Sequence, residues 1–261
     1  MRRVALAVLA AVETALVACV FCALILGISV ALVASPGVTS GLVRLNRTWI
    51  YTGLSETTTV GLADRVRAYV VGRASESSGT STALTQFAPG EVAHLSDVRN
   101  VMTGARIATG GASAALALWL VAALVWRRWR RLRWGIAAGG WLAIGLAAVV
   151  ATIAAVNFEG AFTVFHGLFF APGTWEFPSN SLLIEVFPAG FWVSAGALWG
   201  GLTALGGVAL VVASRFMPSN DAQAQEVSRE RDARRSAVAA REESSSAGHK
   251  ESGHSTDVGP L

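Results

Sequence analysis

The stretch NFEGAFTVFHGLFFAPGTWEFPSNSLLIEVFPAGF, Asn157 to Phe191, decides how this chain folds because it separates two long apolar runs. It is rich in aromatic residues, contains one histidine, His166, and carries no Arg or Lys. Aromatic side chains concentrate at the headgroup level of a lipid bilayer. We therefore expect the segment to be an interfacial aromatic loop that joins two membrane-spanning helices.

The composition indicates an integral membrane protein. Hydrophobic residues make up 53% of the 261 residues and charged residues only 15%, which is too apolar for a soluble domain of this length. The net charge of +4 comes with arginines at the ends of apolar runs and near the C-terminus, so it indicates membrane orientation and no nucleic-acid partner. The two cysteines, Cys19 and Cys22, lie in the first apolar run, so neither a disulfide framework nor a thiolate metal site is expected.

The apolar runs predict an all-α membrane protein with four transmembrane helices, a small extracytoplasmic domain and the interfacial aromatic loop. The first run, from Val4 to Ala34, exceeds the length needed to cross a hydrocarbon core of about 30 Å. A signal peptide is the competing interpretation, but its apolar region is only about 7 to 15 residues long. The expected segments are transmembrane helices at 1–34, 105–126, 135–156 and 191–213, the extracytoplasmic domain at 35–104, a cytoplasmic basic loop at 127–134, the interfacial loop at 157–190 and a disordered cytoplasmic tail at 214–261.

Arginine clusters predict the orientation in the bacterial cytoplasmic membrane. Arg2 and Arg3 precede the first run, residues 127–133 form the basic run RRWRRLR, and Arg215 follows the last run. The positive-inside rule places all three clusters, and therefore both termini, in the cytoplasm. A phosphate or nucleic-acid role for the basic run is the open alternative. Glu13, an acid inside the first run, is either a functional residue or one that snorkels to the interface or pairs with a neighbouring helix.

The expected topology singles out two of the four histidines. His249 and His254 belong to the tail, whereas His94 and His166 are both expected on the outer side, near helix ends. Because imidazole titrates near neutral pH, two histidines that meet there form a candidate centre for acyl transfer or hydrolysis. A metal site is not expected, since the pair lacks a typical third zinc ligand. No pattern indicates a serine hydrolase, a zincin or a phosphate-binding loop.

The spacing around His94 predicts a local cluster. Glu91 and Asp97 each lie three residues from His94, so a helical turn brings the three side chains close together. Both acids are therefore candidate orienters of the imidazole. The alternative interpretation is that Ser96 or Asp97 simply caps the next helix.

Three motifs resemble those of the bacterial lipoprotein intramolecular transacylase (Lit) family. The pattern E-x-x-H-[LM]-x-D-V-[KR] is met by Glu91, His94, Leu95, Asp97, Val98 and Arg99. The pattern F-H-x-[LI]-F-F followed by W is met by Phe165, His166, Leu168, Phe169, Phe170 and Trp175. The pattern L-I-x-x-[LF]-P-x-x-F is met by Leu183, Ile184, Phe187, Pro188 and Phe191. The likeness runs from the first span to the fourth and excludes the tail.

The resemblance implies a cofactor-free membrane acyltransferase whose partners are diacylglyceryl-modified lipoproteins and membrane lipids. An acyl chain would move from the diacylglyceryl ester to the α-amino group of the lipoprotein's N-terminal cysteine. The implied catalytic residues are His94 and His166. The implied supporting residues are Glu91, Asp97, Arg99 and Asn157, and the implied lipid-binding residues are Phe165, Phe169, Phe170 and Trp175.

The competing class is a non-enzymatic membrane scaffold or lipid-binding protein, in which both histidines merely anchor an interfacial loop. The two classes differ in one distance. An acyltransferase needs His94 and His166 to be neighbours beside a site that lipid can reach, whereas a scaffold makes no such demand.

Overall fold

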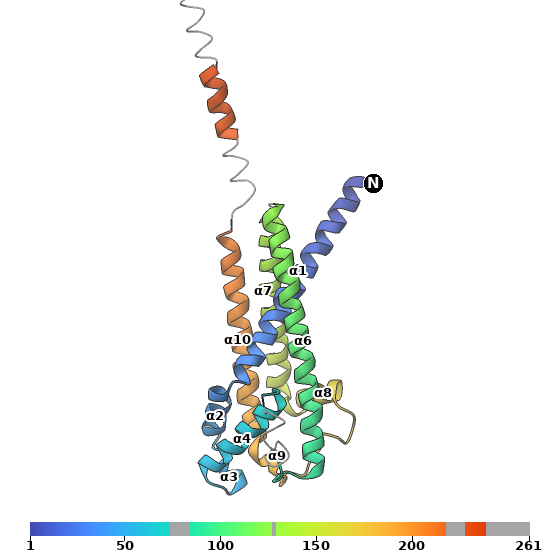
Figure 1. The fold of residues 1–261 in the computed structure, drawn as a ribbon, viewed down its shortest axis with the longest axis vertical. Helices are drawn as coiled ribbons and strands as arrows, with labels where there is room; N and C mark the ends of the chain where they lie inside the picture. The colour runs from blue at the N-terminus through green and yellow to red at the C-terminus, as the bar shows by residue number, and fades with distance from the viewer. Residues whose placement is uncertain (74–83, 127–128, 218–227, 239–261) are drawn as a thin grey trace, which may run out of the picture. The chain divides into compact units, whose positions relative to one another are not determined.

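The computed structural model describes residues 1–73, 84–126, 129–217 and 228–238, and all regular structure within these ranges is helical (Figure 1). Within these ranges, four helices are long and apolar enough to cross a membrane. They are α1 (Arg2–Val33), α6 (Pro89–Val125), α7 (Trp129–Val156) and α10 (Ala189–Arg215). The predicted all-α membrane fold with four candidate spans is therefore confirmed.

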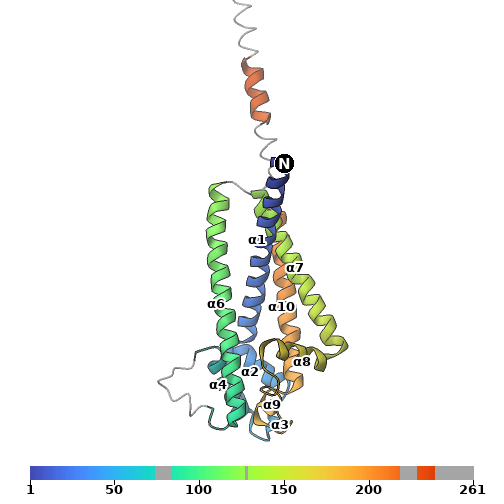
Figure 2. The same cartoon turned by 90° about the vertical axis from the view of Figure 1, so that its right-hand side faces the viewer.

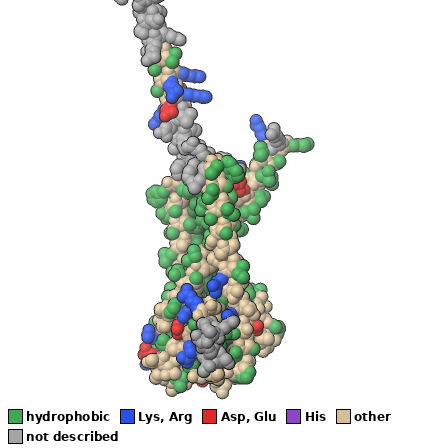
Figure 3. Space-filling model, viewed as in Figure 1, with side chains coloured by type: hydrophobic (Ala, Val, Ile, Leu, Met, Phe, Trp, Pro, Cys, Tyr) green, Lys and Arg blue, Asp and Glu red, His purple; other side chains and the backbone are tan. Residues whose placement is uncertain are grey.

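The bundle is arranged around α1. This helix contacts each of the other three, and it lies between α6 on one side and α7 with α10 on the other (Figure 2). Figure 3 shows hydrophobic side chains along the bundle, while acidic and basic side chains gather over the extramembrane helices at one end. This distribution is that of a protein whose middle faces lipid.

The second spanning helix differs from the expected segment. We placed the border of the extracytoplasmic domain at residue 104, but α6 runs without a break from Pro89 to Val125, 37 residues. At 1.5 Å per residue such a helix is about 55 Å long, so it extends well beyond a hydrocarbon core of about 30 Å. The capping role considered for Ser96 or Asp97 is wrong, because both residues lie inside α6. The helix begins at Pro89 because the fixed φ of proline suits the first position.

The extramembrane end is a small helical domain. It contains α2 (Pro36–Leu45), α3 (Trp49–Thr52), α4 (Glu56–Val70) and α9 (Leu182–Val186). Its core joins α2 and α4 to the first turns of α6 and α10, through Leu42, Val43, Leu62, Ala63, Val66, Leu84, Phe87, Leu95, Leu183, Val186, Phe187, Phe191 and Ala195. The domain therefore holds the starts of two spanning helices in a defined position.

Much of the segment expected to be an interfacial loop is helical. Helix α8 (Phe158–Phe169) starts at the N-cap Asn157, whose side-chain Oδ1 accepts a hydrogen bond of 2.9 Å from the amide of Gly160. Its outward residues are apolar, and Phe165 and Phe169 are 53% and 50% exposed. A short helix with an exposed aromatic face is typical of the membrane interface. The secondary structure thus differs from the expectation, whereas the expected aromatic surface is present.

The other end of the bundle carries an ion pair between helices. Arg131 of α7 pairs with Glu13 of α1, and the indole nitrogen of Trp119 on α6 donates a hydrogen bond of 3.2 Å to the same carboxylate. Of the two roles considered for Glu13, the structure supports pairing with neighbouring helices.

The expected basic loop at 127–134 is shorter than predicted, because α7 already begins at Trp129. Beyond α10, residues 228–238 form a helix in a separate compact unit, 217–261.

Helices α7 and α10 touch through glycines. A Cβ atom built on Gly140 would lie 2.5 Å from the carbonyl oxygen of Gly207, and one built on Gly207 would lie 2.7 Å from the oxygen of Gly140. Both separations are far below van der Waals contact. Only glycine allows the two backbones to approach so closely, as small residues commonly do in membrane bundles.

The substitutions Gly140→Ala and Gly207→Ala are each expected to destabilise the bundle by about 1–3 kcal/mol, because the added methyl group forces the two backbones apart. Thermal unfolding in detergent measures this loss. Gly145→Ala on α7 is the matched control, since its Cβ would meet nothing within 4 Å. That variant should be neutral or slightly more stable, because alanine has the higher helix propensity. Equal effects at positions 140 and 145 would contradict the close contact.

Candidate active site

His94 lies in the second turn of α6 and is only 8% exposed. Its ring meets the edges of Phe170 and Phe177, with centroids 4.8 and 5.7 Å away. Its Nδ1 is buried and has no hydrogen-bond partner in the part of the chain that the structure describes. Because buried polar groups are nearly always paired, such an atom indicates an interaction that the described residues do not supply.

His166 lies in the last turn of α8, within a cage of aromatic rings. Its centroid is 3.9 Å from that of Phe162 and 4.8 Å from that of Trp175. Its Nδ1 is 2.8 Å from the carbonyl oxygen of Phe162, one helical turn earlier. Since a carbonyl oxygen only accepts, the neutral ring carries its proton on Nδ1. The other nitrogen, Nε2, is then free to accept a proton.

The two imidazoles face each other. Their centroids are 6.2 Å apart and their planes are inclined by 26°. Both imidazoles therefore border the same space, so one substrate molecule can reach the edges of both rings. The separation between His94 and His166, which distinguishes an acyltransferase from a scaffold, is therefore short, as an acyltransferase requires.

The aromatic surroundings keep His166 neutral. Burial lowers the pKa of His166 below its ordinary value of 6.5, and the hydrogen bond to the carbonyl of Phe162 opposes this shift only in part. A lowered pKa leaves the ring uncharged at neutral pH, the state in which it can act as a base.

Glu91 does not orient His94 through a hydrogen bond. This carboxylate is 2% exposed; its Oε2 accepts from the amide of Ala88 at 2.7 Å and its Oε1 from the amide of Leu183 at 2.8 Å. The first bond caps the start of α6, as the acid of a capping box does. The second holds the start of α9 against α6. Glu91 therefore clamps together two elements that are distant in sequence.

The other expected supporting residues also lie outside the histidine pair. Asp97 is one turn beyond His94 on α6 and forms no hydrogen bond with it in the described part of the chain. The guanidinium of Arg99 lies 5.1 Å from the ring centroid of Tyr69, which ties α6 to α4. Asn157 caps α8. Arg99 and Asn157 therefore support the scaffold that carries the histidines.

Of the expected lipid-binding residues, three border the pair. Phe165 and Trp175 lie beside His166, and Phe170 lies between the two histidines. Phe169 does not reach either ring; it packs on Phe165 and is half exposed. Phe162 and Phe177 were missed. The spacing of four residues between Phe162 and His166 could have revealed the first, but no local signal places Phe177 beside His94.

Among the described residues, no three His, Cys, Asp or Glu side chains gather as a metal site would require. The fold and the site together define a polytopic membrane protein with two facing histidines among aromatic side chains, one of them on an interfacial helix. This arrangement suits proton transfer at the level of lipid headgroups.

A family model described as lipoprotein intramolecular transacylase Lit matches residues 14–192. This is more than half of the chain, and the chain therefore belongs to that family. It is a multi-pass bacterial membrane protein and an acyltransferase of the lipoprotein transacylase class. The resemblance drawn from the three sequence motifs is thus confirmed.

Solved structures share the fold. The chain is similar to the membrane integral lipoprotein intramolecular transacylase Lit from Bacillus cereus, with a TM-score of 0.69 and 16% identity over 80% of this chain and 95% of that chain. A variant of the same protein with one histidine replaced by arginine gives a TM-score of 0.67 at 15% identity, over 82% and 94% of the two chains. A comparison with curated proteins finds no match.

Proposed function

We propose that the histidine pair moves an acyl chain within a lipoprotein, from the diacylglyceryl ester to the α-amino group of the N-terminal cysteine. The amine nitrogen attacks the ester carbonyl, a C–N bond forms, and the C–O bond to glycerol breaks. The proton lost by the amine ends on the glycerol oxygen. The observation that carries the proposal is the 6.2 Å separation of two imidazoles that come from different helices.

The two histidines divide the proton transfers. His166 is the base, because the carbonyl of Phe162 holds its proton on Nδ1 and leaves Nε2 to accept the amine proton. His94 stabilises the oxyanion or protonates the departing glycerol oxygen. No described residue bonds its Nδ1, so the proton of the neutral ring can lie on either nitrogen. This suits a group that donates a hydrogen bond at one stage and accepts a proton at another.

The reaction needs no second acyl donor, since ester and amine belong to one substrate molecule. The protein has to bring the nitrogen to the carbonyl and hold both beside the edges of the two rings. Effective molarities for well-oriented intramolecular reactions reach about 10⁵–10⁸ M, so positioning alone supplies a large part of the rate. This argument supports a mechanism without a cofactor.

The exposed face of α8 provides a surface for the acyl chains. Phe165 and Phe169 project from this face, and Leu168 is 73% exposed between them. Phe165 also lies 5.5 Å from the ring of His166, which connects this apolar surface to the pair. A lipid lying along α8 would therefore present its ester group close to the histidines.

Mass spectrometry of a synthetic N-terminal diacylglyceryl lipopeptide tests the reaction. With the purified protein in detergent, one acyl chain should appear on nitrogen and one should remain on glycerol, while the total lipid mass stays constant. A phospholipid-dependent N-acyltransferase would instead add the mass of a third chain. If the wild-type protein leaves the lipopeptide unchanged, the proposal is wrong.

The rate should rise with pH between about pH 5 and 8. An α-amino group has an ordinary pKa of about 7.7–8.0, so it is increasingly protonated, and unable to attack, below that range. Below the lowered pKa of His166 the base is protonated too, so the log rate should fall more steeply there. Initial rates with the lipopeptide, measured where the protein stays folded, give the profile. A rate that is flat down to pH 5 would contradict attack by the free amine.

We propose further that both termini face the cytoplasm and that the histidine pair faces the opposite side. Arg131, Arg133 and Arg215 at one end of the bundle support this orientation through the positive-inside rule. In a variant without Cys19 and Cys22, a single cysteine at Ser179 should react with an impermeant thiol reagent added outside, and one at Ser236 should not. The reverse labelling pattern would overturn the orientation.

A further inference from the structure

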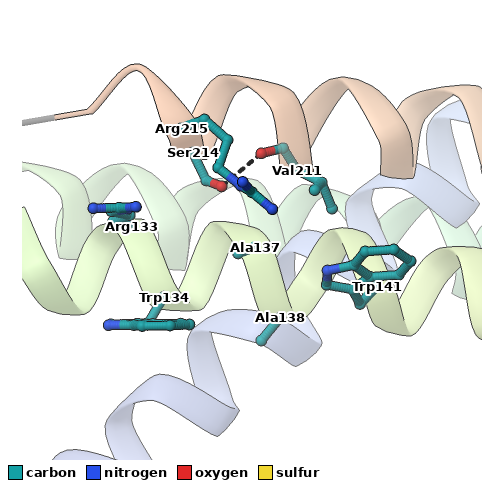
Figure 4. A pocket seen from close by; sticks show the side chains of 8 residues that line it. All are labelled: Arg133, Trp134, Ala137, Ala138, Trp141, Val211, Ser214 and Arg215. Atoms are coloured by element: carbon teal, nitrogen blue, oxygen red, sulfur yellow. Dashed lines mark hydrogen bonds between the residues drawn. The ribbon is translucent and has the colours of Figure 1, made fainter.

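A cavity of about 340 Å³ lies between α7 and α10, at the end of the bundle away from the histidine pair. Two arginines line it, Arg133 from α7 and Arg215 from the last turn of α10. Figure 4 shows the side chain of Arg215 reaching from α10 toward α7, above Ala137. The small side chain of Ala137 leaves the space open beneath this guanidinium.

Among the described residues, no acidic side chain pairs with the positive charge of this cavity. No acidic residue lines it, and neither Arg133 nor Arg215 forms an ion pair within the described ranges. Arg131, two residues earlier, differs because it is paired with Glu13. The hydroxyl of Ser214 is already committed, since it donates to the carbonyl of Val211 at 2.6 Å. The two guanidinium groups are therefore the charged groups in the lining that can bind an anion.

Two tryptophans complete the cavity and arrange its polarity. Trp134 and Trp141 are 62% and 60% exposed, and Trp141 lies two turns farther along α7 from the basic end. Seven residues of helix correspond to about 10 Å. The charged groups and Trp134 thus lie at the end of the bundle, and Trp141 lies deeper. This order matches a phospholipid, whose phosphate is outermost and whose acyl chains begin deeper, whereas a free phosphate ion would contact the arginines without needing Trp141.

We propose that this cavity binds the headgroup of an anionic phospholipid, with the phosphate between Arg133 and Arg215 and the glycerol and upper acyl chains against Trp141. The volume is within the roughly 300–1,000 Å³ of ordinary ligand sites. Basic pockets between spanning helices bind anionic headgroups in the same way. The site is independent of acyl transfer, and the bound lipid joins the ends of α7 and α10.

Native mass spectrometry of the full chain, released from detergent with added phosphatidylglycerol or phosphatidylcholine, tests the site. The wild-type protein should retain phosphatidylglycerol preferentially. The double variant Arg133→Gln/Arg215→Gln should bind it at least about 10-fold more weakly, since each basic residue contributes to anionic-lipid binding. Arg133→Lys/Arg215→Lys keeps both charges and should retain much of the preference.

A matched control separates a site from general attraction. The variant Arg234→Gln/Arg235→Gln removes the same charge from the helix at 228–238 and should bind phosphatidylglycerol like the wild type. Equal binding by wild type and the Arg133/Arg215 glutamine variant would overturn the proposal. So would equal retention of phosphatidylcholine, or displacement of the lipid by inorganic phosphate at the same concentration. Thermal unfolding of the glutamine variant and the wild type, both with phosphatidylcholine as the only added lipid, checks that the variant remains folded.

Discussion

Replacing either His94 or His166 by alanine is expected to abolish acyl transfer while the protein remains folded in the membrane. General acid or base catalysis by one side chain contributes about 10²–10⁴-fold to a rate, and the pair is arranged so that each ring serves the same carbonyl and amine. The double variant should be no slower than the slower single variant by more than a small factor, because groups that act as a unit are not additive.

The lipopeptide assay measures the rate, and thermal unfolding separates lost chemistry from lost structure. His249→Ala/His254→Ala is the matched control, since it removes two histidines from the tail and should leave the rate unchanged. Phe162→Leu adds a finer test. It keeps the backbone carbonyl that orients His166 but removes one ring of its cage, so the rate should fall less than in His166→Ala. A wild-type product yield from either histidine variant would disprove the shared-site mechanism.

Replacing Glu91 by alanine is expected to lower both stability and activity. The substitution leaves the buried amides of Ala88 and Leu183 without their acceptor. Hydrogen bonds to a charged group contribute about 1.5–3 kcal/mol each, and a buried donor left without a partner costs about 1–3 kcal/mol. The loss should therefore amount to several kcal/mol, among the largest of any single substitution in this chain.

The role of Glu91 as a positioning residue can be separated from a catalytic one. Glu91→Gln keeps the shape and one acceptor oxygen, so it should recover part of the stability. The activity that remains in either variant should keep the pH profile of the wild type, because Glu91 has no hydrogen bond to either histidine. Glu185→Ala, in the first turn of α9, removes an acid without disturbing the clamp and serves as the control. A shifted pH profile in Glu91→Gln would show that this carboxylate acts on the reacting groups.

The amino-acid sequence was enough to predict the class of fold and to single out two of the four histidines as site candidates. A bilayer of about 30 Å requires long apolar helices, so runs such as Val4–Ala34 identify spans whatever the neighbouring segments do. The predicted topology then puts His94 and His166 on the same membrane face, because the start of the second span and the end of the third share one side. The aromatic surface near His166 was predicted for the same reason. These features follow from the order of the apolar and charged segments along the chain, which the sequence gives directly.

The tertiary structure alone decided how the site is held. The spacing of Glu91 from His94 predicted an orienting role. Instead, its buried Oε1 accepts a hydrogen bond from the amide of Leu183, which is distant in the sequence. Phe177 comes to His94 in the same way, through the packing of the segment between α8 and α9. Helix periodicity predicts neighbours three or four residues apart; contacts between distant segments depend on how whole helices pack. Only their packing brings the two imidazoles within 6.2 Å of each other.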